Sequence, residues 1–422
     1  MRIGQVSFRL AGSDGVSLET AKQTQILERR GYTSYYFAGE LDPPDQPEEI
    51  IRASIQGAML VPEAHFTHPE AMWITKHAFG SQEKHPEFDQ RLQAFASVIE
   101  SALHEFIDRY HIEVLFLQNI LAIPMNLALS LAVYRVIKTT GIPAVAHHHD
   151  FYWERDYYLT NCVDELLEEV FPPDLPNLRH MVINSMAQKK LTSLGFNSIV
   201  LPNVLDFEQA PPGIDDFNND LRSEIGLDQS DLLFLQPTRV IPRKGIELSI
   251  ELIQKLALPQ IKLVVTHHFE YNSLDYFEEI CAAAARARVP LYYLPARFEP
   301  IRRPGSGLKK VFSLWDAYIH ADFVMYPSLY EGFGNALIEA VFFRKPLLVN
   351  RYQVFKDDIE PTGLKAIKIN GTITGETISQ VQDLLGNPKE IEQITSENLR
   401  IAKEHFSYQV ASTRLEQVLK SL

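Results

Sequence analysis

Short runs of apolar residues alternate with longer amphipathic segments along almost the whole chain. In the first half, these runs predict strands at Gly4–Phe8, Tyr35–Ala38, Val114–Leu117, Ala144–His147, His180–Ile183 and Ser198–Leu201. In the second half, they predict strands at Leu232–Pro237, Lys262–Thr266, Leu291–Leu294, Phe323–Tyr326 and Pro346–Asn350. Short strands that alternate with helices are typical of parallel βαβ units in a doubly wound sheet.

The amphipathic segments between these strands predict helices. They include Leu18–Arg30, Phe88–Tyr110, Leu127–Thr139, Ile246–Leu256, Leu274–Ala287, Leu308–Ile319 and Asn335–Phe342. Strands and helices therefore form two successive sets, one in each half of the chain. Two such sets predict an α/β protein with two Rossmann-like domains.

A change in composition marks the boundary between the two sets. The stretch Asp206–Asp228 is rich in Pro, Asp and Asn and contains no apolar run that predicts a buried strand. We therefore predict an N-terminal domain over residues 1–207 and a second domain over residues 208–395. Residues 391–422 are also predicted to be helical, and their periodicity does not decide which domain they pack on.

The composition is that of a globular protein. Hydrophobic residues make up 45% of the 422 residues and charged residues 22%, which excludes a disordered or collagenous chain. The net charge of −14 disfavours nucleic acids and anionic membranes as partners. Two cysteines, Cys162 and Cys281, are too few for a disulfide framework. Without a signal peptide or a long apolar window, we expect a cytoplasmic protein that is not inserted in a membrane.

The most informative stretch is PSLYEGFGNALIEA at residues 327–340, which follows a predicted strand and opens a predicted helix. Gly332 and Gly334 allow the backbone to approach a ligand closely, and the free amides at a helix start bind anions. Seven residues separate Glu331 from Glu339. A phosphate on these amides would leave Glu331 beside the group that the phosphate carries. The alternative is a simple strand–turn–helix connection with two solvated acids.

Two other loops follow predicted strands. The stretch PTRVIPRKGIELSI at residues 237–250 carries Arg239, Arg243 and Lys244. Cations at the carboxyl end of a parallel strand suit a diphosphate leaving group, although a basic loop could equally offset an acidic surface. In the N-terminal stretch RLAGSDGVSLET, Gly15 permits a tight turn, and Asp14 or Ser17 can cap the next helix. A third basic stretch, residues 297–310, is either a solvated loop or a lid.

The segment AVAHHHDFYWERDYY at residues 144–158 gathers three successive histidines with acids, one arginine and aromatic residues. Successive side chains of a strand point to opposite faces, so His147 and His149 share one face and His148 occupies the other. This arrangement does not form a three-ligand metal site. We therefore expect no metal at the histidines.

The stretch SLYEGFGNALIEA closely resembles the Glu-(seven residues)-Glu signature of retaining glycosyltransferases with the GT-B fold. This large group, glycosyltransferase family 4-like, includes sucrose-phosphate synthase, glycogen synthase and bacterial mannosyltransferases. The resemblance implies two domains that face a cleft, with a C-terminal helix at residues 396–422 that crosses back onto the N-terminal domain. It also implies that Glu331 touches the donor sugar and that Glu339 holds the nucleotide ribose. The intervening donor-binding residues would be Gly332, Phe333, Gly334, Asn335, Ala336 and Leu337.

The other two loops resemble further segments of the same group. PTRVIPRKG is similar to its GR-x-x-x-x-KG segment, which implies that Arg239 and Lys244 contact the diphosphate. The N-terminal loop is similar to the first loop of these enzymes, which lies over the diphosphate and the acceptor. That likeness implies a donor contact at Gly15 and acceptor contacts at Asp14 and Ser17.

The turn after the histidines resembles the His-Asp pair of the group, in which the histidine contacts the donor sugar near its reacting carbon. His149 is the better match, and His148 is a second match shifted by one residue. His148, Asp150 and Arg155 would then lie at the acceptor. Arg155 occupies roughly the place of a basic contact to the acceptor phosphate in sucrose-phosphate synthases.

The resemblance predicts the retaining transfer of a hexose from a nucleotide diphosphate sugar to a small, soluble, anionic acceptor. A reaction of the sucrose-phosphate synthase type with UDP-glucose is the preferred assignment, and GDP-mannose is the rival donor. The alternatives are a glucosylglycerate or mannosylglucosylglycerate type of synthase and a nucleotide-sugar 2-epimerase. Enzymes of this group need no metal or other cofactor, and we expect the same of this chain.

Overall fold

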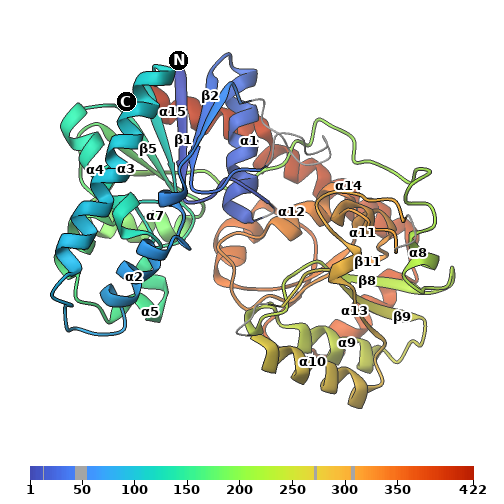
Figure 1. The fold of residues 1–422 in the computed structure, drawn as a ribbon. Coiled ribbons are helices and arrows are strands. Elements are labelled where there is room, and N and C mark those ends of the chain that lie inside the picture. Colours follow the sequence, from blue (N-terminus) through green and yellow to red (C-terminus); the bar gives the residue numbers. More distant parts are fainter. Residues whose placement is uncertain (13, 43–54, 270–272, 306–308) are drawn as a thin grey trace. The chain divides into compact units, whose positions relative to one another are not determined.

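The computed structural model describes residues 1–12, 14–42, 55–269, 273–305 and 309–422. The chain divides into two compact units. The N-terminal unit consists of Met1–Asn203 together with Tyr408–Leu422, and the C-terminal unit consists of Val204–Ser407. Each unit has its own parallel sheet with helices on both faces (Figure 1).

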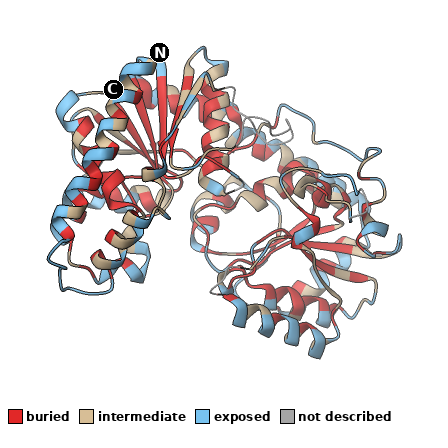
Figure 2. Ribbon diagram, in the orientation of Figure 1, coloured by how far each residue is buried: buried red, intermediate tan, exposed pale blue. Residues whose placement is uncertain are grey.

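The sheet of the N-terminal unit has seven strands in the order β3-β2-β1-β4-β5-β6-β7. Its strands are β1 (Arg2–Ser7), β2 (Thr33–Ala38), β3 (Gly57–Leu60), β4 (Val114–Gln118), β5 (Ala144–His148), β6 (Leu178–Val182) and β7 (Ser198–Val200). The central strands are buried because helices cover both faces of the sheet (Figure 2). All paired strands are parallel, so their carboxyl ends lie at one edge, where ligands bind in such sheets.

The helices of the N-terminal unit are α1 (Gly15–Arg29), α2 (Pro69–Ala78), α3 (Phe88–Tyr110), α4 (Leu127–Thr140), α5 (Asp156–Leu159), α6 (Asp164–Val170), α7 (Ser185–Ser193) and α15 (Tyr408–Lys420). Helices α3 and α4 pack together on one face of the sheet, and α1 and α15 lie on the other (Figure 1). The Arg30 Nε donates to Ser412 Oγ over 2.6 Å, and the Tyr408 hydroxyl donates to Gln25 Oε1 over 3.0 Å. The last helix is thereby tied to α1.

The C-terminal unit contains a six-stranded sheet in the order β10-β9-β8-β11-β12-β13. Its strands are β8 (Leu232–Gln236), β9 (Ile261–Val265), β10 (Leu291–Tyr293), β11 (Phe323–Tyr326), β12 (Leu347–Asn350) and β13 (Ile367–Ile369). Its helices are α8 (Leu221–Glu224), α9 (Ile246–Leu256), α10 (Leu274–Ala287), α11 (Leu314–His320), α12 (Asn335–Phe342), α13 (Gly375–Leu385) and α14 (Pro388–His405). Strands β8 and β11 are neighbours, so the loops that follow them leave the same edge of the sheet side by side.

Some elements differ from those expected. Strands β3 and β13 were not predicted, because both are short and their apolar runs are too brief to stand out. The helix predicted over Leu308–Ile319 begins only at Leu314, since Val311 and Phe312 instead form bridges with Arg303 and Phe298. Leu308 itself lies outside the described residues.

The C-terminal segment is two helices and not one. Helix α14 ends at His405, and the Leu205 N–H donates to the Phe406 carbonyl over 3.0 Å at the break. Helix α14 packs on α12 and α13, so residues 396–407 belong to the C-terminal unit, and only the segment from Tyr408 joins the N-terminal unit. The predicted boundaries lay at 207 and 395, against 203 and 407 in the structure.

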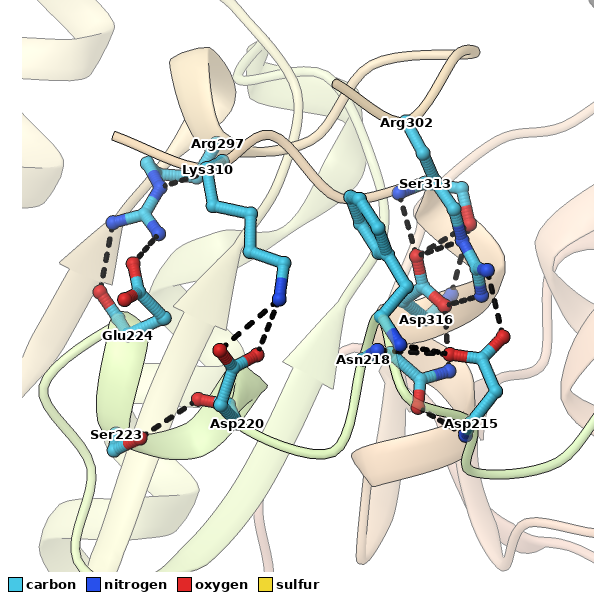
Figure 3. Close-up of polar contacts among 11 residues, drawn as sticks. Asp215, Asn218, Asp220, Ser223, Glu224, Arg297, Arg302, Lys310, Ser313 and Asp316 are labelled. Carbon is cyan, nitrogen blue, oxygen red and sulfur yellow. Dashed lines mark hydrogen bonds and ion pairs between the residues drawn. The ribbon is translucent and has the colours of Figure 1, made fainter. Parts of the chain in front are cut away.

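Three cations of the basic stretch at residues 297–310 pair with the acidic segment 215–224 (Figure 3). The nitrogen-to-carboxylate distances between the two segments are 2.9 Å for Arg297–Glu224, 2.8 Å for Lys310–Asp220 and 2.7 Å for Arg302–Asp215. Phe217 lies between two of these cations, with its ring centroid 5.1 Å from the Arg302 guanidinium and 4.6 Å from the Lys310 ammonium. These side chains fasten residues 215–224 to the rest of the C-terminal unit.

Candidate active site

The turn between β11 and α12 is built around a glycine. Gly334 has a φ of +126°, which side-chain-bearing residues rarely adopt. A Cβ at this position would lie 2.8 Å from the Tyr326 hydroxyl and 2.9 Å from the Tyr352 hydroxyl. The Tyr352 hydroxyl donates to the Phe333 carbonyl over 2.5 Å. Two buried tyrosines therefore form a floor under the turn, and only glycine fits above it.

Glu331 lies at the start of this turn and is only 7% exposed. Its Oε1 accepts from the ammonium of Lys244, and its Oε2 accepts from Nη1 of Arg243 over 2.9 Å. Burial alone would raise the pKa of Glu331, but the two cations outweigh it and hold that pKa below its ordinary value. The carboxylate is therefore ionised at neutral pH, and it can accept hydrogen bonds from hydroxyl groups.

The loop between β8 and α9 positions the two cations. Gly245 has a φ of +63°, and a Cβ there would lie 2.6 Å from the Pro327 carbonyl oxygen, so the loop packs tightly against the β11–α12 loop. The buried Gln236 at the end of β8 donates to the Lys244 carbonyl over 3.0 Å. Arg239 lies on the same loop and is exposed, near Lys244. The sequence motif named Arg239 and Lys244 but not Arg243, which occupies a variable place in it.

The start of helix α12 follows the turn that carries Glu331. Gly334 precedes the helix, and no side chain caps it. The Leu337 N–H donates to the Gly334 carbonyl over 3.2 Å, and the Leu337 side chain is buried in the core. Glu339 lies one turn farther on, where its Oε2 accepts from the Tyr318 hydroxyl over 2.8 Å. A helix N-terminus that follows the turn of Glu331, which itself contacts Lys244, is an electropositive place that suits a phosphate.

In the N-terminal unit, Asp14 caps helix α1. Its Oδ1 accepts from the amides of Val16 and Ser17 over 3.1 and 3.2 Å, and its Oδ2 accepts from the Ser17 hydroxyl over 2.6 Å. Nε of Arg9 also donates to that oxygen over 3.2 Å. Gly15 is exposed and does not have a positive φ, so it is the first residue of the helix and not the apex of the turn.

The three histidines of β5 separate as their alternation predicts. His148 is buried, and its Nε2 lies 3.0 Å from Nδ1 of His180 on β6. His147 lies on the opposite face of the sheet, where its ring packs 4.3 Å from that of His149. Nε2 of His149 is buried and has no hydrogen-bond partner in the part of the chain that the structure describes. Burial lowers the pKa of His149 to about 4, against the opposing effect of Asp150 and Asp14, so the ring is neutral.

Asn119, which the sequence analysis missed, supports the turn after the histidines. Its side-chain oxygen accepts from the amides of His149 and Asp150 over 2.9 and 3.3 Å, and its nitrogen donates to Asp150 Oδ1 over 2.5 Å. Its φ of +63° is a rare conformation that asparagine tolerates better than most residues. The only signal in the sequence is an asparagine that directly follows a buried strand.

Arg155 forms an ion pair with Asp150, and half of its side chain is exposed. Among the described ranges, no group of three His, Cys, Asp or Glu side chains is arranged to hold a metal ion. No helix in the same ranges is both long and apolar enough to cross a membrane.

Comparison with known proteins identifies relatives over nearly the whole chain. The mannosylglucosylglycerate synthase of Petrotoga mobilis is 33% identical over 392 residues, which cover 87% of this chain and 86% of the relative. This chain belongs to the mannosylglucosylglycerate synthase family. The synthase of the same name from Thermotoga maritima is 30% identical, and the match covers 99% of each chain. No protein-family model matches the sequence.

The synthase family has the predicted fold. Sucrose-phosphate synthase from Thermosynechococcus elongatus superposes with a TM-score of 0.68 over all of this chain and 98% of its own, at 13% identity. The prediction of a GT-B glycosyltransferase is confirmed, and this member of the synthase family is a nucleotide-sugar glycosyltransferase.

Within each unit, the structure of this synthase-family member brings together most of the predicted site residues. In the C-terminal unit, Glu331 contacts Lys244, and Arg239 lies near by. In the N-terminal unit, His149 lies near both Asp14 and Asp150. His148 is not part of this group, because it faces His180 on the other side of the sheet. The assignment of His149, and not of its register-shifted alternative His148, to the donor sugar stays a prediction.

Proposed function

We propose that this chain transfers mannose from a nucleoside diphosphate mannose to glucosylglycerate, with retention of anomeric configuration. The observation that carries the proposal is the 33% identity with a mannosylglucosylglycerate synthase over 87% of the chain. The name of that relative describes a product in which mannose is attached to glucosylglycerate. Glucosylglycerate is a small anionic acceptor, the class that the motifs predict.

The arrangement in the C-terminal unit suits the departure of a diphosphate. In a front-face reaction, the bond between the anomeric carbon and the diphosphate breaks while the acceptor oxygen bonds to the same face. The acceptor proton passes to the departing phosphate oxygen, so no side chain has to act as a base. Lys244, Arg239 and the start of α12 would stabilise the charge on the diphosphate.

Two side chains would orient the transferred sugar. Glu331 is ionised and can accept hydrogen bonds from sugar hydroxyls. The unpartnered Nε2 of His149 offers a neutral ring nitrogen to a hydroxyl near the reacting carbon. Both would act while positive charge develops on the sugar ring.

A donor-by-acceptor screen tests the proposal. GDP-mannose, UDP-mannose and UDP-glucose are each incubated with glucosylglycerate, glycerate and fructose 6-phosphate, and release of the nucleoside diphosphate is measured. Fastest release with a mannose donor and glucosylglycerate supports the proposal. Fastest release with fructose 6-phosphate refutes it. Conversion of a nucleotide sugar without any acceptor would indicate the 2-epimerase alternative.

We expect full activity in excess EDTA. Cationic side chains and a helix terminus would provide the charge stabilisation that a divalent metal supplies in other transferases. The rate of transfer is measured after dialysis against EDTA and again after addition of Mg²⁺ or Mn²⁺. A rate that returns only with added metal contradicts the expectation.

We also expect that replacing Arg155 by alanine raises the KM for the acceptor about 10-fold and leaves the KM for the donor unchanged. A guanidinium can form paired hydrogen bonds with a carboxylate, and that of Arg155 is half exposed beside Asp150. The matched control is Arg400→Ala, which removes an exposed arginine of α14 that pairs with Glu397 and Glu404. An unchanged acceptor KM would show that Arg155 is only a surface charge.

A further inference from the structure

Arg243 connects the two loops of the C-terminal unit that carry the candidate donor site. Its Nη1 donates to Glu331 Oε2 over 2.9 Å and to the Tyr330 carbonyl over 3.0 Å. Its own carbonyl accepts from the Leu329 amide over 2.8 Å. Three hydrogen bonds thus join one residue of the β8–α9 loop to three successive residues of the β11–α12 loop.

The two oxygens of Glu331 are divided between two cations. Lys244 holds Oε1 and Arg243 holds Oε2. Lys244 is nearly buried, with 10% of its side chain exposed, whereas 36% of the Arg243 side chain is exposed. If Lys244 turns toward a diphosphate, its contact with Oε1 weakens and that oxygen becomes available to a sugar hydroxyl. The contact of Arg243 with Oε2 remains and keeps the carboxylate in place.

We propose that Arg243 is a positioning residue that holds Glu331 against the transferred sugar. This inference rests on the proposed function insofar as a nucleotide sugar occupies these loops. Arg243 holds the Glu331 carboxylate by its contact with Oε2. Its contact with the Tyr330 carbonyl also holds the backbone next to Glu331. A planar guanidinium suits this task because its donors have a fixed geometry, which a lysine ammonium lacks.

The proposal separates Arg243 from the residues that would bind the diphosphate. Its Nη1 already serves two acceptors on the loop that would face the sugar. Removing Arg243 should therefore weaken the recognition of the sugar and leave the recognition of the nucleoside diphosphate intact. A side chain that only maintained the fold of the loops would affect both equally.

The test compares Arg243→Gln, Arg243→Lys and the control Arg400→Gln with the unmodified chain. Calorimetry measures the binding of GDP and of GDP-mannose, or of UDP and UDP-glucose if the donor screen selects that pair. For Arg243→Gln we expect unchanged binding of the nucleoside diphosphate, about 10-fold weaker binding of the nucleotide sugar and a 10- to 100-fold lower kcat. The acidic limb of the kcat/KM profile should move to higher pH, because Glu331 loses one of its two cations.

Arg243→Lys should recover part of the lost rate, since it restores the charge but not the fixed geometry. Equal weakening of the binding of the nucleoside diphosphate and of the nucleotide sugar would overturn the proposal, because a contact with the phosphates and a purely structural role both affect the two ligands alike. Unchanged binding of both the nucleoside diphosphate and the nucleotide sugar would also overturn the proposal, because the ion pair of Arg243 with Glu331 would then have no effect on sugar recognition. If no mannose donor reacts with glucosylglycerate in the donor screen, the proposed substrate is refuted. The binding of the nucleoside diphosphate and of the nucleotide sugar is then compared for the donor that the screen selects. The melting temperature of each variant shows whether it is folded.

Discussion

Replacing Lys244 by methionine or Glu331 by glutamine is expected to lower the rate of sugar transfer at least about 100-fold, while the chain remains folded. Lys244 would lose its charge beside the departing diphosphate, and Glu331 would lose the ionised carboxylate that accepts from sugar hydroxyls. Both side chains are nearly buried, and removing one member of a buried pair leaves the other charge unpaired. Methionine and glutamine keep the size of each side chain, and Arg243 still pairs with Glu331 in the first variant.

Transfer rates and melting temperatures are measured for each variant and for the double variant. Because the two side chains contact each other, we expect their effects on stability not to be additive. The control is Lys255→Met, which breaks the exposed pair of Lys255 with Glu251 on α9. Near-normal turnover in both single variants would contradict the assignment of the site.

Lowering the pH from 6.5 toward 4 is expected to destabilise the N-terminal unit. Burial lowers the pKa of His180 to about 4 and that of its neighbour His148 well below the ordinary value. In the unfolded chain both titrate near 6.5, so between these values the unfolded state binds protons that the folded state does not. The stability from these neutral rings is present above pH 6.5 and is lost as the pH falls, by about 1.4 kcal/mol per pH unit for each histidine.

The free energy of unfolding in urea is measured between pH 7 and pH 4.5. The double variant His148→Phe/His180→Phe removes both titrating rings but keeps aromatic packing beside Phe151 and Phe196, so its stability should fall less steeply with decreasing pH. His85→Gln, at an exposed position, serves as the control and should keep the original slope. An equal slope in the double variant and the unmodified chain would show that this pair does not control the acid response.

Much of the fold could be predicted from periodicity because strand and helix patterns are local properties. The helices over Ile246–Leu256, Leu274–Ala287 and Asn335–Phe342 lie where their amphipathic patterns place them. The pattern fails at Val311 and Phe312, which are apolar because they pack within the loop and not because they belong to a helix. A hydrophobic pattern shows that a residue is buried, but it does not show which neighbour buries it.

The candidate site was predictable to the extent that it depends on motifs with fixed spacing. Gly334 is required by a positive φ above two tyrosines, and Glu331 precedes it at a distance that the turn determines. The contacts of Asn119 with the turn after the histidines and of Arg243 with Glu331 could not be predicted in this way. These contacts join residues that are 30 and 88 positions apart in the sequence, respectively.

The sequence by itself determined two α/β units, the loops that we propose carry the chemistry, and the opposite faces of the histidines on β5. These follow from local steric rules and from the alternation of side chains along a strand. Only the tertiary structure decided that Glu331 is shared between Lys244 and Arg243, that His148 pairs with His180 and that the last helix lies on α1. The first two facts depend on strand order and register, which bring together side chains far apart in the chain through parallel pairing. The third depends on the packing of two helices that are far apart in the chain.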